Sequence, residues 1–140
     1  MKLLRGTKKS RALMLKYIDT NILLRYLVDD PQADSIEKML KEEKELILLD
    51  LVVGEVVWTL QTFYKLKKAK IAELVTNLVS LKSIKCNARV VLAALETYRN
   101  KNISYTDAYI AASMKAKRAS LIYSFDRDFD KIPHIRRIEP

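Results

Sequence analysis

The sequence contains a single cysteine, a single histidine and only two glycines. One cysteine, Cys86, cannot form a disulfide within the chain, which suits a reducing, cytoplasmic environment. One His and one Cys cannot assemble a His/Cys zinc site, and a Ser-His-Asp arrangement would have to use His134. Because Gly6 and Gly54 are the only glycines, the chain has no P-loop, G-x-G-x-x-G or G-x-S-x-G motif. An enzyme with this sequence must therefore rely on carboxylates and the metal they hold.

The sequence also lacks a long apolar run. No apolar stretch approaches the length of a membrane span, and the N-terminus has no long apolar segment of the kind found in secretory signals. We therefore expect no membrane association. With 140 residues, 49% hydrophobic and 31% charged, the chain has the composition of one ordinary globular domain.

The positive charge is concentrated at the N-terminus. The formal net charge is +9, but the first 16 residues contain six basic side chains and no acidic one. The remaining residues therefore carry 20 basic against 17 acidic side chains, a balance that permits nucleic-acid binding without demanding it. We interpret residues 1–13 as a basic N-terminal extension and residues 14–140 as the compact domain. The extension is either an arm for RNA or an upstream segment without function, and we favour the second.

Short apolar runs alternate with amphipathic helical stretches along the rest of the chain. Strands are predicted at residues 15–18, 46–49, 83–86, 120–125 and 135–138, and helices at residues 21–28, 32–43, 51–66, 71–81, 87–98 and 104–119. This alternation predicts an α/β/α sandwich, in which helices cover both faces of a mostly parallel central sheet.

Acidic residues recur just past the predicted strand ends or in the first turns of helices. They are Asp19, Asp50, Glu55, Asp107, Asp126 and Asp128. Right-handed crossovers bring such positions to one edge of a parallel sheet, where ligands bind. Clustered carboxylates repel each other unless a cation neutralises them, and oxygen ligands without His or Cys indicate Mg²⁺ or Mn²⁺. Such a site suits phosphodiester hydrolysis.

Each acid also has a purely structural interpretation. Asp19 and Asp50 are good helix caps, and Asp107 is a first-turn acid that the helix dipole favours. Asp126 can lie in a solvated turn. Glu55 is the hardest to explain in this way, because an unpaired carboxylate in its otherwise apolar stretch would be costly. Taken together, at matching positions, the acids are better interpreted as one site.

Four stretches in this order resemble PIN-domain ribonucleases, in particular the VapC-like toxins of VapBC-type toxin–antitoxin pairs. The stretches are Tyr17-Ile18-Asp19-Thr20-Asn21, Glu55-Val56-Val57-Trp58, Thr106-Asp107-Ala108 and Ser124-Phe125-Asp126-Arg127-Asp128-Phe129. The resemblance implies that a divalent metal is held by Asp19, Glu55, Asp107 and Asp126. It implies that Thr20 and Asn21 support Asp19 and that Ser124 supports Asp126, with Asp128 as an addition to the site.

The resemblance implies a Mg²⁺- or Mn²⁺-dependent endoribonuclease that leaves 5′-phosphate and 3′-hydroxyl ends. It also implies a homodimer, a small antitoxin partner and a cytoplasmic location. Candidate contacts to the RNA backbone are Arg25, Lys65, Lys67, Lys68, Lys115, Lys117, Arg118 and Arg127. The alternatives are a PIN-fold RNA-processing nuclease without an antitoxin and a non-catalytic domain that binds RNA or a partner. A phosphatase with an Asp nucleophile ranks lower, because its D-x-D pattern would need an acid where Asn21 stands.

Overall fold

The computed structural model describes residues 15–140, so the predicted extension of residues 1–13 lies outside the described part. The helices are α2 (Thr20–Leu27), α3 (Ala33–Glu42), α4 (Asp50–Thr62), α5 (Lys68–Val79), α6 (Ala88–Asn100), α7 (Tyr105–Ala116) and the 3-10 helix η1 (Arg127–Lys131). The strands are β1 (Lys16–Tyr17), β2 (Leu46–Ile47), β3 (Ile84–Lys85), β4 (Leu121–Tyr123) and β5 (Arg136–Ile138). In the described residues, no helix has both the length and the hydropathy of a membrane span.

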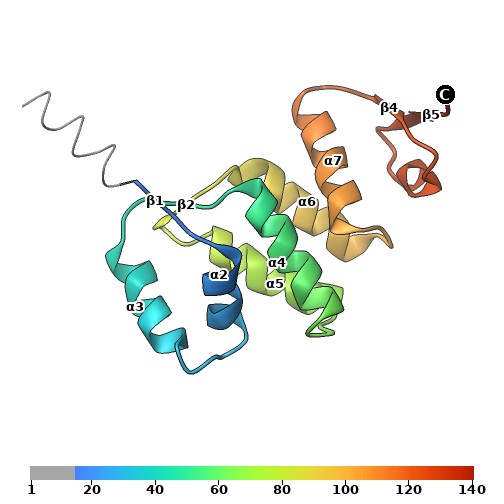
Figure 1. Ribbon diagram of the computed structural model, residues 1–140. Coiled ribbons are helices and arrows are strands. Elements are labelled where there is room, and N and C mark those ends of the chain that lie inside the picture. The colour runs from blue at the N-terminus through green and yellow to red at the C-terminus, as the bar shows by residue number, and fades with distance from the viewer. Residues whose placement is uncertain (1–14) are drawn as a thin grey trace, which may run out of the picture.

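Every strand pair in the structure is parallel, which confirms the predicted α/β class. Strand β2 lies between β1 and β3, with Leu46 opposite both Lys16 and Ile84. Strand β4 pairs with β5, and Leu121 lies opposite Arg136. These two sheets do not join, and Figure 1 shows β4 and β5 at the opposite end of the molecule from β1 and β2. The strand ends are therefore split between two places in the fold.

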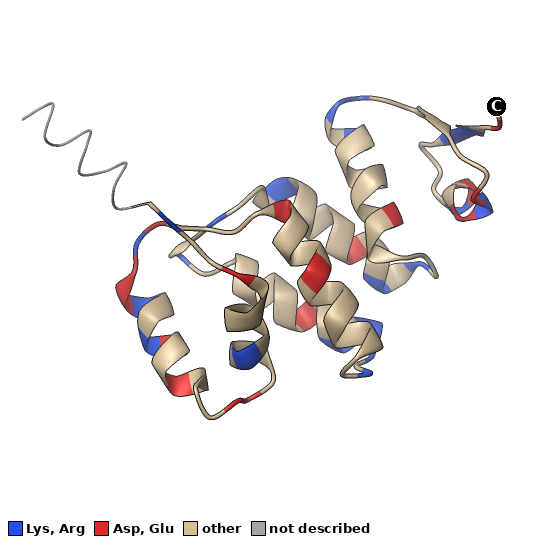
Figure 2. Ribbon diagram, in the orientation of Figure 1, with Lys and Arg blue, Asp and Glu red and all other residues tan. Residues whose placement is uncertain are grey.

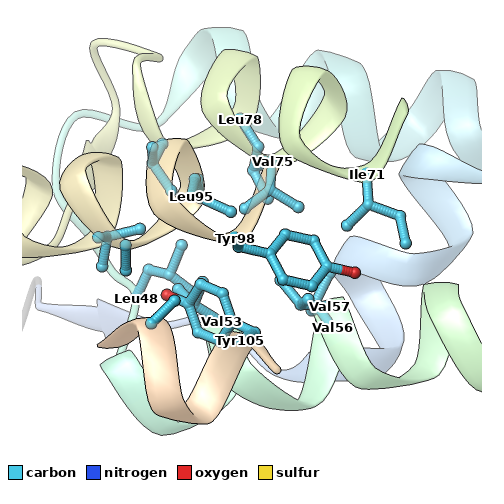
Figure 3. Close-up of a cluster of buried hydrophobic side chains, with 14 of the residues drawn as sticks. Leu48, Val53, Val56, Val57, Ile71, Val75, Leu78, Leu95, Tyr98 and Tyr105 are labelled. Carbon is cyan, nitrogen blue, oxygen red and sulfur yellow. The ribbon is translucent and has the colours of Figure 1, made fainter. Parts of the chain in front are cut away.

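The core lies where helices α4, α5, α6 and α7 meet. Figure 3 shows Tyr98 of α6 among buried side chains from the other helices, including Val57 of α4 and Ile71 of α5. Tyr98 is fully buried, and its hydroxyl donates a hydrogen bond of 2.6 Å to Gln61 Oε1. This bond removes the cost of burying an unpaired hydroxyl, so the ring adds its full apolar surface to the core.

Two helices end at least three residues earlier than the sequence pattern predicts. Helix α4 stops at Thr62 rather than residue 66, and α7 stops at Ala116 rather than residue 119. In each case a basic residue just beyond the helix takes a left-handed backbone conformation, with φ of 57° at both Lys65 and Arg118. This conformation ends a helix, and glycine is the residue that normally signals it. Because lysine and arginine occupy these positions, no glycine marks the two helix ends in the sequence.

The predicted start of α7 at Ser104 is confirmed. Ser104 Oγ accepts a hydrogen bond of 3.1 Å from the backbone N–H of Asp107, which has no partner within the first helical turn. Ser104→Ala should therefore lower the free energy of unfolding by about 1 kcal/mol, whereas Ser104→Thr should largely retain it. Urea denaturation followed by circular dichroism measures both values. Equal losses in the two variants would contradict the capping role.

Candidate metal centre

Three carboxylates come together where α7 meets η1. One carboxylate oxygen each from Asp107, Asp126 and Asp128 lies within 4.8 Å of the others. Local turns place them: the backbone N–H of Asp126 donates to Ser124 Oγ at 3.0 Å, and Asp126 Oδ1 accepts from the N–H of Asp128 at 2.9 Å. Ser124 thus contacts the backbone of Asp126, and Asp128 is the third member of the cluster.

Apolar contacts hold η1 against α7. Phe129 and Ile132 are buried in the core that α7 shares, so the turn that carries Asp126 and Asp128 cannot rotate freely away from the helix. The ring nitrogen Nε2 of His134 lies 3.2 Å from the carbonyl oxygen of Ala111 in α7. The only histidine of the chain is therefore a structural contact between these elements.

Burial and the neighbouring carboxylates raise the pKa of one member of the cluster, Asp107. Burial is the main cause of the raised pKa of Asp107, and the charges of Asp126 and Asp128 raise it further. Lys131 forms an ion pair with the cluster, because its Nζ lies 2.8 Å from Asp128 Oδ1. Lys131 was not among the predicted site residues. Its distance of three positions from Asp128 nevertheless favours an ion pair on a helical turn.

Asp19 and Glu55, the other two predicted ligands, lie outside this cluster. Thr20 Oγ1 donates a hydrogen bond of 2.7 Å to Glu55 Oε2, so Thr20 supports Glu55 rather than Asp19. Asp19 precedes α2, but its side chain makes no capping hydrogen bond, which leaves the simple cap interpretation without support. Glu55 is exposed, so the predicted burial cost does not apply to it. Asn21, the other predicted support for Asp19, is also exposed.

Residues of α4 and α7 line a pocket beside the carboxylate cluster. Glu55 and Thr106, the residue before Asp107, both line it. Figure 2 shows acidic segments on α4, on α7 and in η1. In residues 15–140, only Asp107, Asp126 and Asp128 form a carboxylate group tight enough to hold one ion. The predicted meeting of all the acids at one sheet edge is not observed, because β1 and β4 belong to separate sheets.

Asp50 has a different role from the predicted cap. Leu49 occupies the capping position of α4, and Asp50 is the first residue of the helix. Asp50 Oδ2 accepts hydrogen bonds from the hydroxyl of Tyr109 and, at 3.4 Å, from Nδ2 of Asn87. Asn87 precedes α6 as predicted, but its side chain makes no capping bond. These contacts join residues far apart in the sequence, so no local pattern predicts them.

Lys68 is not available for the predicted contact with RNA. Its Nζ donates to the carbonyl oxygens of Tyr98 at 3.3 Å, Lys101 at 3.2 Å and Ile103, and it lies 4.4 Å from the centre of the Tyr98 ring. Burial is the main cause of the lowered pKa of Lys68, while the charge of Asp128 opposes this effect. The side chain therefore stabilises the end of α6 and the loop beyond it.

The donor set fits a small divalent cation. Three carboxylates supply only oxygen ligands, which Mg²⁺ and Mn²⁺ prefer, and α7 and η1 hold them close together. A cation there would also relieve the repulsion that raises the pKa of Asp107. Asp107, Asp126 and Asp128 are thus the residues that could hold a metal.

Comparisons with known proteins include two solved structures of low similarity and one family model. A VapC20 structure from Mycobacterium tuberculosis, described as a Sarcin-Ricin loop cleaving toxin, is 16% identical with a TM-score of 0.39, covering 90% of this chain and 99% of that chain. VapBC2 from Rickettsia felis, bound to a DNA fragment from its promoter, is 18% identical with a TM-score of 0.37, covering 89% and 98%. No curated protein matches the sequence significantly. The family model of the PIN domain matches residues 16–135. Since this match extends over most of the chain, the protein belongs to the PIN domain family.

Proposed function

We propose that the protein is a Mg²⁺- or Mn²⁺-dependent endoribonuclease. The observation that carries this proposal is the cluster of Asp107, Asp126 and Asp128 in a member of the PIN domain family. When bound to these carboxylates, a divalent ion supplies charge neutralisation for the scissile phosphate and a water molecule of lowered pKa. Hydrolysis of one phosphodiester bond, in which water attacks phosphorus and the P–O3′ bond breaks, would leave a 5′-phosphate and a 3′-hydroxyl.

The chain's own residues have separate parts in this proposal. Asp107, Asp126 and Asp128 would hold the metal, and Ser124 would keep Asp126 in position. Glu55, fixed by Thr20, faces the substrate from the opposite side of the pocket, and we assign Asp19 to the same side.

Exposed cations at the end of α7 and in η1 are the proposed contacts to the RNA backbone. Lys115, Lys117 and Arg118 lie at the end of α7, and Arg127 lies between Asp126 and Asp128. Because contacts of this kind release counterions, affinity for RNA should fall as salt is raised.

We propose further that the protein is the cytoplasmic toxin of a toxin–antitoxin pair. A small antitoxin would lay an apolar segment along the pocket and place a basic side chain near the carboxylates, which attract a cation as they attract metal. The alternative is an RNA-processing nuclease that has no such inhibitor. Co-purification from the native host distinguishes them, because only the toxin should retain a small basic partner that blocks cleavage.

A cleavage assay tests the nuclease proposal directly. The protein should cut structured or single-stranded RNA in the presence of Mg²⁺ or Mn²⁺, and a chelator should stop the reaction. The metal should also raise the melting temperature, since it binds only the folded state. Cleavage that persists unchanged in the chelator would overturn the metal-dependent mechanism.

The proposed homodimer needs an exposed apolar surface. The apolar residues of α5, such as Ile71 and Val75, are buried in the chain's own core, so that helix offers no surplus apolar surface. Large apolar side chains are instead exposed along the open edges of the two sheets, namely Tyr17 on β1, Tyr123 on β4 and Phe125 just beyond it. A second copy that covers these edges would bury them.

Light scattering should accordingly show a dimer at micromolar concentration. Tyr123→Lys should shift the protein toward the monomer, because the side chain is 74% exposed and a charge there opposes edge-to-edge association. Leu51→Lys is the matched control, since Leu51 is equally exposed but lies on α4. A wild-type protein that remains a strict monomer would contradict the homodimer.

A further inference from the structure

The pocket between α4 and α7 has the dimensions and walls of a binding site for a flat ring. Its volume is about 490 Å³. Leu51 and Trp58 lie two helical turns apart on α4 and both face it, with Gly54 between them. A Cβ atom at Gly54 would meet nothing within 4 Å, so open space adjoins the helix backbone there. A planar group can therefore reach the backbone beside the indole.

Trp58 is unusually exposed for its size. Its side chain is 67% exposed, although an indole ring normally contributes its large apolar surface to a core. Nucleobases stack on such aromatic faces, and each stacked base contributes about 1–3 kcal/mol to single-stranded nucleic-acid binding. The apolar wall of the pocket thus suits a base that has been unstacked from RNA.

A fixed carboxylate stands at one end of the pocket. Asp50 lines it, and the hydroxyl of Tyr109 and Nδ2 of Asn87 both donate to Asp50 Oδ2. No other side chain or backbone group of residues 15–140 donates to Asp50, which leaves Oδ1 to accept from a ligand.

This carboxylate distinguishes among the four bases. Guanine presents two adjacent N–H donors on its Watson–Crick edge, and Oδ1 of Asp50 can accept both with its two lone pairs. Adenine and cytosine each present one amino group beside an acceptor nitrogen. Uracil presents a single N–H between two carbonyl oxygens, and a carboxylate repels those oxygens. A base that makes two hydrogen bonds is favoured over a base that makes one by about 1–3 kcal/mol.

The pocket lies beside the candidate metal centre. Thr106, which lines it, is the residue before Asp107, and Glu55, held by Thr20, also lines it. A base in the pocket is therefore joined through its ribose to a phosphate beside the acidic residues. We propose that this pocket binds a guanine base of the RNA substrate, stacked on Trp58 and hydrogen-bonded to Asp50, and this proposal rests on the nuclease function above.

The single tryptophan of the chain provides a direct test. The full-length protein, in a chelator and without divalent metal, is titrated with GMP, AMP, CMP and UMP while Trp58 fluorescence is recorded. We expect saturable quenching with all four that is at least about 10-fold tighter for GMP than for UMP. Asp50→Asn should abolish this preference while the quenching persists. Equal affinity for all four nucleotides, or no quenching, would overturn the proposal.

A second measurement uses RNA rather than mononucleotides. Anisotropy of a labelled, G-containing oligonucleotide should show about 10-fold weaker binding for Trp58→Ala, corresponding to the loss of one stacked base. Phe63→Ala is the matched control, because Phe63 is 74% exposed just beyond the same helix but does not line the pocket, and its affinity should equal the wild type. Both side chains are exposed, so circular dichroism should show folded variants.

The outcomes separate this proposal from the nuclease function. Metal-dependent cleavage without any nucleotide effect on Trp58 would overturn the guanine pocket and leave the nuclease intact. GMP-selective quenching in a protein that cuts no RNA would support the pocket and overturn the nuclease. Trp58 emission that changes with protein concentration, but not with nucleotide, would show that this face binds another protein chain and would overturn the pocket.

Discussion

Asp107→Asn is expected to lower metal-dependent RNA cleavage by at least about 100-fold. Asp107 contributes one of the three carboxylates of the cluster, and an uncharged amide holds a divalent cation far less well. Replacement of residues that merely orient metal ligands typically costs 10- to 100-fold in metal affinity or activity, so loss of a ligand should cost more. Single-turnover cleavage of one RNA at saturating Mg²⁺ measures the effect.

The same substitution should leave the metal-free protein as stable as the wild type or more stable at neutral pH. Burial and the charges of Asp126 and Asp128 raise the folded-state pKa of Asp107 above its unfolded value. The folded state therefore binds its proton more tightly, and stability falls as pH rises from the unfolded pKa through the folded pKa. Asn carries no such charge, so its advantage should disappear in acid, below the ordinary carboxyl range.

A matched control separates this effect from the helix dipole. Asp34 is an exposed first-turn acid of α3, as Asp107 is a first-turn acid of α7, but it lies outside the carboxylate cluster. Asp34→Asn should reduce stability by only a few tenths of a kcal/mol, because it loses a favourable dipole interaction, and it should retain full activity. Chemical denaturation at pH 4 and pH 7 compares the two variants.

The stability gained on adding Mg²⁺ should also differ between the wild type and Asp107→Asn. A ligand present at 100 times its dissociation constant stabilises the folded state by about 2.7 kcal/mol, so the wild type should gain stability that Asp107→Asn largely lacks. An Asp107→Asn protein that cuts RNA at the wild-type rate would remove Asp107 from the site. Asp107 would then have only the structural role of an acid in the first turn of α7.

The parts of the site that the sequence could predict are those that local geometry determines. Ser104 and Asp107 belong to one capping turn, and Ser124, Asp126 and Asp128 belong to another, so their backbone contacts follow from spacing alone. The alternation of strands and helices likewise predicted parallel pairing.

The remaining contacts depend on how distant elements pack. Thr20 reaches Glu55 across 35 positions, and Asp50 reaches Tyr109 across 59, so neither pair leaves a periodic signal. The separation of β4 from β1 also follows from tertiary packing, because Phe129 and Ile132 hold the last strands against α7. The rule that strand ends meet at one sheet edge therefore predicted Asp19 and Asp126 in one site. In the structure Asp19 lies outside the cluster that contains Asp126.

Lys68→Met should produce a large loss of stability for a partly exposed position. The Lys68 ammonium group donates to the carbonyl oxygens of Tyr98, Lys101 and Ile103, and thereby binds the C-terminal end of α6 and the loop that leads to α7. Cations at this end of a helix also interact favourably with the helix dipole, and the Tyr98 ring adds a cation–π contact.

The expected loss of stability follows from the carbonyl groups that Lys68→Met leaves without their charged donor. Met occupies a similar volume but donates no hydrogen bond, so three carbonyl groups lose a charged partner. Hydrogen bonds to charged groups contribute about 1.5–3 kcal/mol each in favourable cases, and partial solvent access reduces the sum, which gives an expected loss of about 3 kcal/mol. Lys70→Met, at an exposed position of the same helix, is the control and should change stability by less than about 0.5 kcal/mol. Urea denaturation at pH 7 measures both, and equal stabilities of the two variants would show that the Lys68 contacts do not hold α6 and α7 together.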